Sequence, residues 1–442
     1  MRSLWNRRAA IPLIARALWA NYPCPTEFVG ATPTVRRWVN YARLLWSWYH
    51  IETTVALYPA RLCIEASSAC NLECPYCFTG AGERSRERTM LTPAFFTRLL
   101  DEMGAYLWQV EFHNWGEPLL NKHLIAMIVE AHARGLSTMF NTNFSMPFDA
   151  ARAEALVRSG LTILGVSIDG ARQASYEQYR VKGRLDLVLE NCRLVADAKR
   201  RLGSATPRMN WSFHLFPFNV GDVADAQAQA TALGMVFHVA RGRVVGTDWD
   251  PEERFIAHEH VTPMPCYTLF HTAVMYGNGS VAPCRGSYYA PDDMGRVAAD
   301  GRPGASSFKA VWNNERFRLA RRLFRDRPIH RDRATQAEQQ HICFECPTRL
   351  DCRNFAEFRT AGGRPQDWVP PHNSHVRYNY FWQRKRCHET AASPRRRIPA
   401  IRQAIAQTDS DEGLPNTLAS GRALSTDLPV RLEGAAAPGS KA

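Results

Sequence analysis

Long apolar runs are missing from this sequence. No run reaches the ~18 consecutive apolar residues that a membrane-spanning helix needs. A secretory signal is missing as well, because the first apolar stretch, AAIPLIARALWA (9–20), is interrupted by Pro12 and Arg16 and lacks a small-residue cleavage pattern. We therefore expect a soluble, cytoplasmic protein, with peripheral membrane contact left as an open alternative.

Acidic residues are in deficit. The chain has 42 Asp and Glu against 55 Lys and Arg, which gives a formal net charge of +13. This balance permits nucleic acid, acidic membranes or anionic substrates as partners. Much of the excess lies toward the two ends, however, in RRW (36–38), RKR (384–386) and RRR (395–397). A nucleic-acid groove spreads its positive charge through the fold, so the sequence does not favour nucleic acid.

Cysteines are too few for a disulfide scaffold. Twelve are spread over 442 residues, whereas small secreted disulfide-stabilised domains are far denser in cysteine. Five of them lie in two tight motifs, CxxxCxxC at 70–77 and CxxC at 343–346. This clustering favours metal or cluster ligation in a reducing compartment. Cys24, Cys63 and Cys192 stand apart, and we interpret them as buried small apolar residues.

Composition divides the chain into four parts. Residues 1–58 form an aromatic and basic extension, 59–245 an α/β region, 246–388 an irregular region with cysteine clusters, and 389–442 a tail that lacks periodicity. The tail is rich in Pro, Ser, Gly, Ala and Arg, a composition typical of disorder. In the extension, RRWVNYARLLWSWYH (36–50) has aromatic and apolar residues at helical spacing. We expect this helix to pack on the main domain; the alternative is an interfacial helix with tryptophans at the lipid headgroups.

Six apolar runs between 59 and 245 predict strands. Each is rich in β-branched and aromatic residues: RLCIEA (61–66), WQVEFHNW (108–115), LSTMFNTNF (136–144), LTILGVSIDG (161–170), MNWSFHLF (209–216) and MVFHVARG (235–242). Helical patterns lie between them, and such alternation predicts parallel βαβ units. Six units make a partial version of the eight-unit barrel, in which the chemistry takes place at the C-terminal ends of the strands. The polar motifs fall at these ends.

The stretch CNLECPYCF (70–78) follows the first predicted strand and places Cys70, Cys74 and Cys77 within eight residues. This spacing differs from the paired CxxC or CxxH arms of structural zinc sites. Closed iron–sulfur clusters commonly use four cysteines, so three thiolates on a four-iron cube leave one iron open to a small molecule. A zinc loop with a distant fourth ligand is the alternative.

This loop resembles the hallmark of the radical S-adenosylmethionine (SAM) enzymes, and the resemblance extends over roughly residues 60–390. It implies a partial (βα)6 barrel, a [4Fe-4S] cluster on Cys70, Cys74 and Cys77, and SAM chelated to the open iron. An electron, from a donor such as flavodoxin or ferredoxin, then cleaves SAM to methionine and a 5′-deoxyadenosyl radical that takes a substrate hydrogen. The family's aromatic residue before the third cysteine, here Tyr76, packs beside the adenine. The cofactor carries the hard chemistry, and the protein positions it.

Further motifs that resemble the family's SAM site follow the next three strands. NWGEP (114–118) resembles the GGEP motif, whose carbonyls and carboxylate, here around Gly116 and Glu117, accept hydrogen bonds from the SAM ammonium. Trp115 replaces the family's first glycine, a departure expected to alter packing. NTNF (141–144) and SIDG (167–170) supply candidates for the methionine carboxylate and the ribose hydroxyls, and YEQYR (176–180) supplies a partner for the carboxylate. These candidates are Asn143, Ser167, Asp169 and Arg180.

The later cysteines resemble the SPASM or shorter twitch extension, which binds auxiliary [4Fe-4S] clusters. Cys266 precedes TAVMYGNGSVAPC (272–284), a hairpin pattern with a GNG turn, which ends in Cys284. The full two-cluster pattern needs a cysteine at 356, where the chain has Ala, so one cluster is expected and two remain an alternative. The favoured ligands are Cys266, Cys284, Cys343 and Cys346. The alternative set is Cys343, Cys346, Cys352 and Cys387, which could also form a zinc knuckle.

These resemblances imply an oxidoreductase of the maturase type. It would modify a C–H bond of a peptide or protein, oxidatively or by epimerisation; the alternative is the same chemistry on a sugar, cyclitol or other small molecule. The extension looks too short for the leader-binding domain of many peptide-modifying relatives, which keeps the small-molecule class open. A non-enzymatic alternative is a zinc or iron–sulfur scaffold that binds RNA or membrane. No general base can be assigned: His113, Asp292 and Asp293 are candidates with ordinary structural explanations.

Overall fold

The computed structural model describes residues 28–242, 265–298, 306–325 and 330–344, together with Cys346, Thr348, Arg349 and Ala361. The expected tail over 389–442 and the cysteines 24, 352 and 387 lie outside these residues. No helix among the described residues has the length and apolarity to cross a bilayer.

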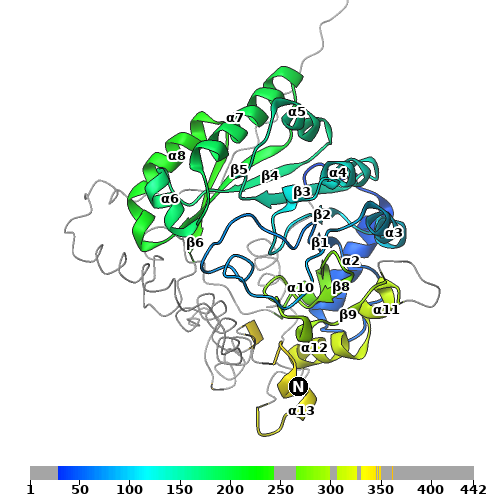
Figure 1. Cartoon of the computed structure of the whole chain (residues 1–442). Helices are drawn as coiled ribbons and strands as arrows, with labels where there is room; N and C mark the ends of the chain where they lie inside the picture. The colour runs from blue at the N-terminus through cyan, green and yellow to red at the C-terminus, as the bar shows by residue number, and fades with distance from the viewer. Residues whose placement is uncertain are drawn as a thin grey trace, which may run out of the picture.

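A parallel sheet flanked by helices forms the main body (Figure 1). All six predicted strands are present. The order along the chain is β1 (Arg61–Ile64), α3 (Pro93–Met103), β2 (Gln109–Glu111), α4 (Leu124–Ala133), β3 (Ser137–Thr142), α5 (Ala150–Arg158), β4 (Ile163–Ser167), α6 (Gln173–Tyr179), α7 (Leu185–Leu202), β5 (Arg208–Leu215), α8 (Val223–Ala232) and β6 (Val236–Arg241). Short 3₁₀ turns, η2 (Pro118–Leu120) and η3 (Pro217–Asp222), precede α4 and α8. Neighbouring strands β1 to β6 pair in chain order and in parallel, as βαβ units require.

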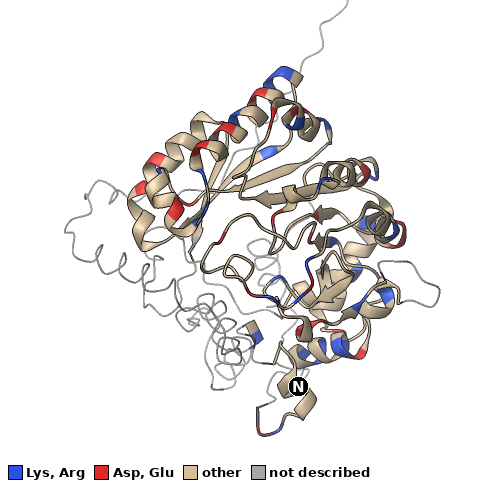
Figure 2. Ribbon diagram, viewed as in Figure 1, with Lys and Arg blue, Asp and Glu red and all other residues tan. Residues whose placement is uncertain are grey.

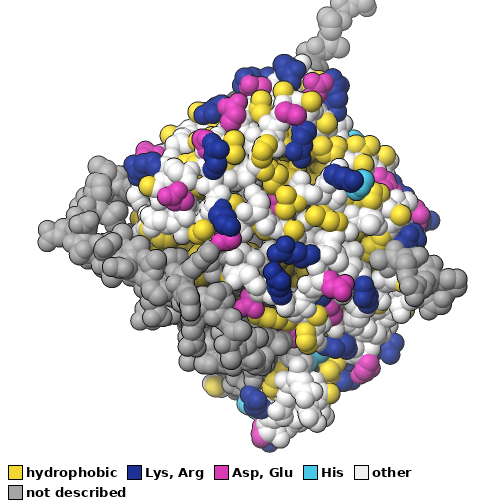
Figure 3. Space-filling view, viewed as in Figure 1, with side chains coloured by type: hydrophobic (Ala, Val, Ile, Leu, Met, Phe, Trp, Pro, Cys, Tyr) yellow, Lys and Arg dark blue, Asp and Glu magenta, His cyan; other side chains and the backbone are white. Residues whose placement is uncertain are grey.

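The helices pack on the sheet through one apolar face each. In α3, Thr92 caps the first turn by accepting the Phe95 amide, Pro93 occupies the first turn, and Phe95, Phe96, Leu99, Leu100 and Met103 are buried. The outer faces of α5 and α7 carry acidic and basic residues in alternation (Figure 2), including the Arg158–Glu154 and Arg200–Asp197 pairs. Over the described part of the face in Figure 3, basic and acidic side chains are likewise interspersed.

The C-terminal region extends the same sheet. After α10 (Thr268–His271), β7 (Thr272–Met275) pairs in parallel with β1, and the antiparallel strands β8 (Ser280–Ala282) and β9 (Gly295–Arg296) follow. The resulting order is β6-β5-β4-β3-β2-β1-β7-β8-β9. The predicted hairpin is therefore confirmed, and it lies directly on the strand that leads to Cys70. The remaining elements are η4 (Ala290–Asp292), α11 (Phe308–Trp312), α12 (Glu315–Arg325) and α13 (Gln336–Gln340).

Helix α2 (Val35–Tyr49) lies at the N-terminal ends of the strands. The Arg37 side chain, 3% exposed, donates to the carbonyls of Thr32, Gly135 and Arg134, which lie before the helix and before β3. Trp48 is buried and donates from its indole nitrogen to the Pro265 carbonyl. The expected packing of this helix on the main domain is confirmed, and it closes the end of the sheet opposite the cysteine loop.

Candidate functional site

The cysteine loop begins directly after β1, at the C-terminal edge of the sheet. Cys74 is buried, and Cys70 and Cys77 are half-buried. Three N–H donors point at these thiols: the Leu72 amide at 3.5 Å and Asn143 Nδ2 at 3.7 Å from Cys70 Sγ, and Arg180 Nη1 at 3.8 Å from Cys74 Sγ. Donors and a guanidinium at this distance stabilise thiolate sulfur, which is the form that ligates metal.

Burial acts against the thiolates. It raises the pKa of Cys70 to about 11 and that of Cys74 to about 12, although the Arg180 charge lowers both. The neighbouring cysteine thiols raise these pKa values further, so the three sulfurs lie within one another's electrostatic reach. A metal group that binds here must displace protons, and its affinity should rise with pH.

The donor set fits an iron–sulfur cluster in its chemistry. Three thiols of one loop lie within one another's electrostatic reach, and N–H donors from Asn143 and Arg180 point at two of them. Among the described residues, no three His, Cys, Asp or Glu side chains converge closely enough to hold a single metal ion. Cysteine sulfur is the ligand by which proteins hold iron–sulfur clusters, so the three cysteines of this loop fit such a group in their chemistry.

Gly116 sits where only a glycine fits. A Cβ atom built there would lie 1.8 Å from the Ser67 carbonyl oxygen, in the loop that leads to Cys70. The next residue, Glu117, is 2% exposed and joins three segments: one oxygen accepts from Thr142 Oγ1 at 2.6 Å and the Leu119 amide, and the other accepts from the Asn143 amide at 2.8 Å. A carboxylate offers about four acceptor positions, so one is left for an ammonium group.

Asn143 links the end of β3 to the cysteine loop. Its side-chain amide donates to Asn71 Oδ1 at 2.9 Å as well as toward Cys70, and its carbonyl oxygen accepts from the Ser145 amide. Ser167 is half-buried at the end of β4, in register with Ser212 of β5. Both residues lie at the C-terminal strand ends, where the sequence predicts them.

Asp169 and Arg180 form a buried ion pair. Asp169, fully buried, accepts from Arg180 Nε at 2.6 Å, and its second oxygen accepts from the His214 amide at 2.6 Å and lies 3.0 Å from His214 Nδ1. Burial alone would raise the pKa of Asp169, but the Arg180 charge and the contacts with His214 outweigh it and the pKa falls. Arg180 thus spans the space between Asp169 and Cys74.

Aromatic rings wall the cysteine loop. Tyr76, 6% exposed, stacks on Tyr179 at 6.2 Å and on Phe216 at 6.3 Å between ring centroids. These residues form an apolar cluster with Leu72 and Cys74, separate from the main core. The sequence analysis did not single out Tyr179 or Phe216. The sequence did hold a signal for both: Tyr179 directly precedes the candidate Arg180, and Phe216 directly follows the fifth strand.

Four later thiols lie within electrostatic reach of one another. Cys266, Cys284, Cys343 and Cys346 influence one another electrostatically, and burial together with this proximity raises the pKa of Cys346 to about 12 and of Cys266 to about 11. This is the favoured ligand set of the sequence analysis. The alternative set includes Cys352 and Cys387, which lie outside the described residues.

Arg86 ties the cysteine loop to the hairpin segment that follows β7. Its guanidinium forms a two-pronged ion pair with Asp293, donates to the Tyr288 carbonyl at 3.0 Å and lies 3.8 Å above the centre of the Tyr276 ring. Nearby, Phe78 stacks on Tyr288 at 4.9 Å, and Trp115 contacts both rings edge-on. Trp115, the departure in the NWGEP motif, thus packs between the two cysteine-bearing regions.

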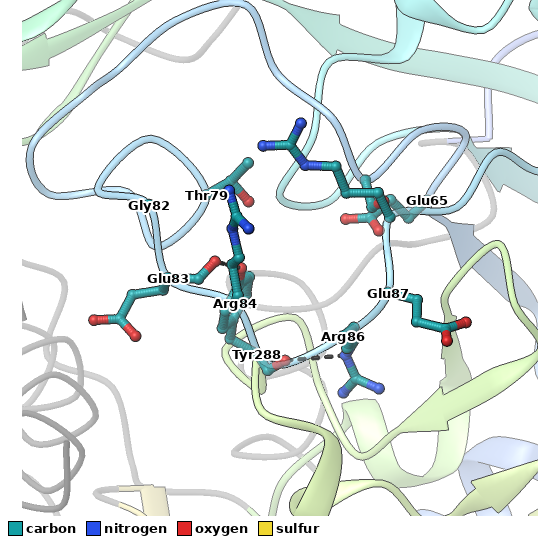
Figure 4. A pocket seen from close by; sticks show the side chains of 10 residues that line it. Glu65, Thr79, Gly82, Glu83, Arg84, Arg86, Glu87 and Tyr288 are labelled. Carbon is teal, nitrogen blue, oxygen red and sulfur yellow. Dashed lines mark hydrogen bonds between the residues drawn. The ribbon is translucent and has the colours of Figure 1, made fainter. Parts of the chain in front are cut away.

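A cavity of about 390 Å³, lined mostly by residues with charged or polar groups, opens at this junction (Figure 4). It is lined by Glu65, Ser68, Thr79, Gly82, Glu83, Arg84, Arg86, Glu87, Arg88 and Tyr288. Glu65, 3% exposed, accepts the Trp115 amide at 3.1 Å, and burial raises its pKa to about 7. Thr79, one of the lining residues, is two residues from Cys77 along the chain.

Charged side chains that are buried or half-buried lie on the neighbouring strands β1 and β2. Arg61 pairs with the buried Glu111 at 3.2 Å, and Arg285, next to Cys284, pairs with the same carboxylate. His113 is 8% exposed, and burial, with the Arg61 charge, lowers its pKa to about 4. His113 is therefore neutral at physiological pH, which matches the structural interpretation of this residue.

Comparison with known proteins identifies a family match for the α/β part of the chain. Residues 64–207 match the model of the radical SAM superfamily. The match begins at the last residue of β1 and includes the cysteine loop, Glu117, Asp169 and Arg180. The resemblance stated from the sequence is confirmed for this part of the chain.

Individual relatives are distant. Fe-coproporphyrin III synthase of Methanosarcina barkeri is 29% identical over 126 residues, 28% of this chain and 31% of that protein. A probable dual-specificity RNA methyltransferase RlmN of Mycolicibacterium gilvum is 25% identical over 237 residues, 48% of this chain and 62% of that protein. The chain thus spans less than two thirds of either relative. The crystal structure of Streptococcus suis SuiB bound to S-adenosylmethionine has 14% identity and a TM-score of 0.48, covering 76% of this chain and 81% of that one.

Proposed function

Because residues 64–207 form a radical SAM domain, we propose that this protein is an enzyme that uses SAM and a [4Fe-4S] cluster to modify a C–H bond of a peptide or protein. The observation that carries the proposal is the meeting of Cys70, Cys74, Asn143 and Arg180 at the C-terminal strand ends. Donors within 4 Å of the thiol sulfurs support a thiolate-ligated group at that point.

The residues of the site have distinct proposed roles. Cys70, Cys74 and Cys77 would hold the cluster, which when bound supplies the electron that cleaves SAM to methionine and a hydrogen-abstracting 5′-deoxyadenosyl radical. The free acceptor position of Glu117 would take the SAM ammonium, in line with its burial and three existing partners. Arg180, held by Asp169, keeps a positive charge beside Cys74 that would attract the SAM carboxylate.

The adenine and ribose ends have their own candidates. Tyr76, with Tyr179 behind it, offers an aromatic face against which an adenine could pack. Asn143 and Ser167 present polar groups at adjoining strand ends. Asp169 is occupied by Arg180 and His214, so we propose that it orients the arginine instead of binding the ribose directly.

Anaerobic reconstitution tests this function. With iron, sulfide, dithionite and SAM, the protein should show iron–sulfur absorption and release 5′-deoxyadenosine. Cys74→Ala should lose SAM cleavage, whereas Cys192→Ala, a buried cysteine on α7, should retain it. If the wild-type protein forms no 5′-deoxyadenosine, the enzymatic proposal is refuted. The remaining alternative is then a non-enzymatic scaffold that binds RNA or membrane. Retained cleavage in Cys74→Ala would refute the ligand assignment.

We propose one auxiliary cluster on Cys266, Cys284, Cys343 and Cys346. Their mutual proximity supports this set. A Cys266→Ala/Cys284→Ala variant should lose about half of the iron of a two-cluster protein and keep the SAM-cleaving cluster. Cys352→Ala/Cys387→Ala is the matched control and should keep all of its iron. The reverse pattern would favour the alternative set.

The substrate is tested by isotope transfer. A peptide deuterated at the reacting carbon should pass deuterium into 5′-deoxyadenosine. In the cell, we propose that the electron comes from a flavodoxin or ferredoxin in the cytoplasm. Transfer from a sugar or cyclitol but from no peptide would favour the small-molecule alternative. A short precursor-peptide gene beside this gene would supply the first peptide to try. The cavity at the Arg86 junction is our proposed route for the substrate to the loop.

A further inference from the structure

The cavity at the Arg86 junction has a buried carboxylate in its wall. Glu65 directly follows β1, is 3% exposed and lines the cavity, on the side opposite Gly82 in Figure 4. Its carboxylate accepts the Trp115 amide at 3.1 Å, and the Gly116 amide is a second donor to it. A carboxylate offers about four acceptor positions, so about two of them are left for a bound group.

No cation is paired with this carboxylate. Within the part of the chain that the structure describes, Glu65 forms no ion pair. The Arg86 charge acts on Glu65 from a distance, but the Arg86 guanidinium is paired with Asp293. Burial therefore dominates, and it raises the pKa of Glu65 to about 7. A cationic group bound in the cavity would supply the counter-charge that the protein itself does not.

The other free charges of the cavity lie nearer to solvent. Arg84, Glu87 and Arg88 are exposed, and Glu83 is half-buried. Water and salt screen exposed charges, whereas a buried carboxylate acts at short range and in a lower dielectric. Among the described residues, no three His, Cys, Asp or Glu side chains converge closely enough to hold a metal ion. The cavity therefore favours an organic cation that reaches Glu65.

The walls of the cavity suit a slim cation on an alkyl chain. Because Glu65 is 3% exposed, only a narrow group can reach its carboxylate. A guanidinium pairs best with both oxygens of a carboxylate, and here one oxygen already accepts the Trp115 amide. The Tyr288 ring offers the apolar surface along which lysine lays its stem. The volume of about 390 Å³ lies within the range of ligand pockets, about 300–1,000 Å³.

We propose that this cavity holds a lysine side chain of the substrate, with the ammonium on the Glu65 carboxylate and the alkyl stem along Tyr288. The inference rests on the proposed function, because it takes the substrate to be a peptide or protein. Tyr288 and Cys77 lie within electrostatic reach of each other. A lysine held here would therefore keep the adjoining peptide segment close to the cysteine loop, and Glu65 would act by binding the substrate.

Equilibrium binding of a defined peptide tests this contact. The probe is a short peptide, capped at both ends, with one central lysine, and the control peptide carries Nε-acetyllysine instead. Calorimetry measures binding to the reconstituted full-length protein with SAM and without reductant, so that no turnover takes place. The lysine peptide should bind at least about tenfold more tightly than the acetylated peptide, because only the lysine peptide brings a charged donor to Glu65.

Glu65→Gln removes the charge and keeps the size of the side chain and an acceptor for the Trp115 amide. This variant should bind the two peptides equally. Glu87→Gln is the matched control, because Glu87 is an exposed acid of the same cavity; its preference for the lysine peptide should stay within about twofold of wild type. Thermal unfolding followed by circular dichroism verifies that both variants are folded.

The wild-type protein provides a second measurement that needs no substitution. From pH 6 to pH 8 the preference for the lysine peptide should grow by up to about tenfold, because Glu65 ionises around pH 7 and the lysine ammonium stays charged. The other groups that act on Glu65 keep their charge state in this range. Arg86 remains positive, and burial raises the pKa of Cys63, Tyr276 and Tyr288, so these three remain protonated.

Several results would overturn the proposal. These are equal binding of the two peptides by the wild-type protein, a preference that survives in Glu65→Gln, and a preference that is flat or falls from pH 6 to pH 8. Binding of glucosamine, or of a lysine-free peptide with a free N-terminus, in place of the lysine peptide would also overturn it. The proposed function fails separately, since 5′-deoxyadenosine formation measures the SAM chemistry and calorimetry measures the lysine contact.

Discussion

Replacing Arg86 by Met should detach the hairpin segment from the cysteine loop. The methionine keeps most of the apolar stem, but it cannot pair with Asp293 or donate to the Tyr288 carbonyl. The side chains of Arg86 and Asp293 are 8% and 14% exposed, so the carboxylate would be left nearly buried without a counter-charge. The contact between guanidinium and the Tyr276 ring, at 3.8 Å, would be lost as well.

The expected loss of unfolding free energy is about 3 kcal/mol. Breaking a buried ion pair costs about 3–5 kcal/mol, and we take the lower end because part of Asp293 reaches water. Since domains are stable by roughly 5–15 kcal/mol, this loss is a large fraction of the total. Asp293→Asn in the same chain removes the stranded charge. Arg86→Met/Asp293→Asn should therefore lose less than the two single variants together.

Urea unfolding of the four proteins, followed by circular dichroism, measures this cycle. Arg84→Met is the matched control, because Arg84 lines the same cavity, is exposed and forms no ion pair with a described residue; its effect should stay within about 0.5 kcal/mol. Hydrogen exchange should locate the loosening of Arg86→Met in residues 276–293. A wild-type midpoint for Arg86→Met, or strictly additive variants, would refute the reasoning.

Two further predictions concern the strand ends. Gly116→Ala should weaken SAM binding to the reconstituted protein at least about tenfold with the fold retained, because the new Cβ would collide with the Ser67 carbonyl and shift Glu117. Gly221→Ala is the control: its Cβ would meet open space, so it should bind SAM normally in calorimetry, and equal binding by the two variants would contradict the assignment. Burial lowers the pKa of His113 to about 4 in the folded protein, against an ordinary value of 6.5 in the unfolded chain. Below pH 6.5 the unfolded chain therefore takes up a proton that the folded chain does not, and stability falls toward pH 4 by up to about 1.4 kcal/mol per pH unit. His113→Gln should show a correspondingly shallower acid slope in urea titrations, and an unchanged slope would show that His113 titrates normally.

Local patterns in the sequence suffice for much of this fold. Each of the six strands is a short β-branched or aromatic run, and each lies where its run lies, because propensity and burial agree there. The helix over Val35–Tyr49 follows from its spacing, and the hairpin follows from its GNG turn. The cysteine loop could be found because its ligand spacing is contained in eight residues.

Long-range pairings could not be predicted in the same way. Nothing in TAVM indicates that β7 adds to β1, since many strands would fit an open parallel edge. Asp169 was a candidate for direct ligand contact, and its double use by Arg180 and His214 depends on three segments meeting. The packing of α2 (Val35–Tyr49) needed the structure too, because the sequence alone does not say which of its apolar side chains, such as Trp38 or Trp48, is covered.

The position of β1 between β2 and β7 has a consequence for how this chain is made. During synthesis, Arg61 of β1 leaves the ribosome early, and its partner Gln109 of β2 follows soon after. Its partner on the other side, Thr272 of β7, is synthesised much later. Until then the strand that carries the cysteine loop has one bare edge, a template for pairing with other chains. A truncated chain that stops before Cys266 would keep that edge permanently, so an attempt to isolate the radical SAM region alone should yield aggregate, because β7 would no longer cover the edge of β1.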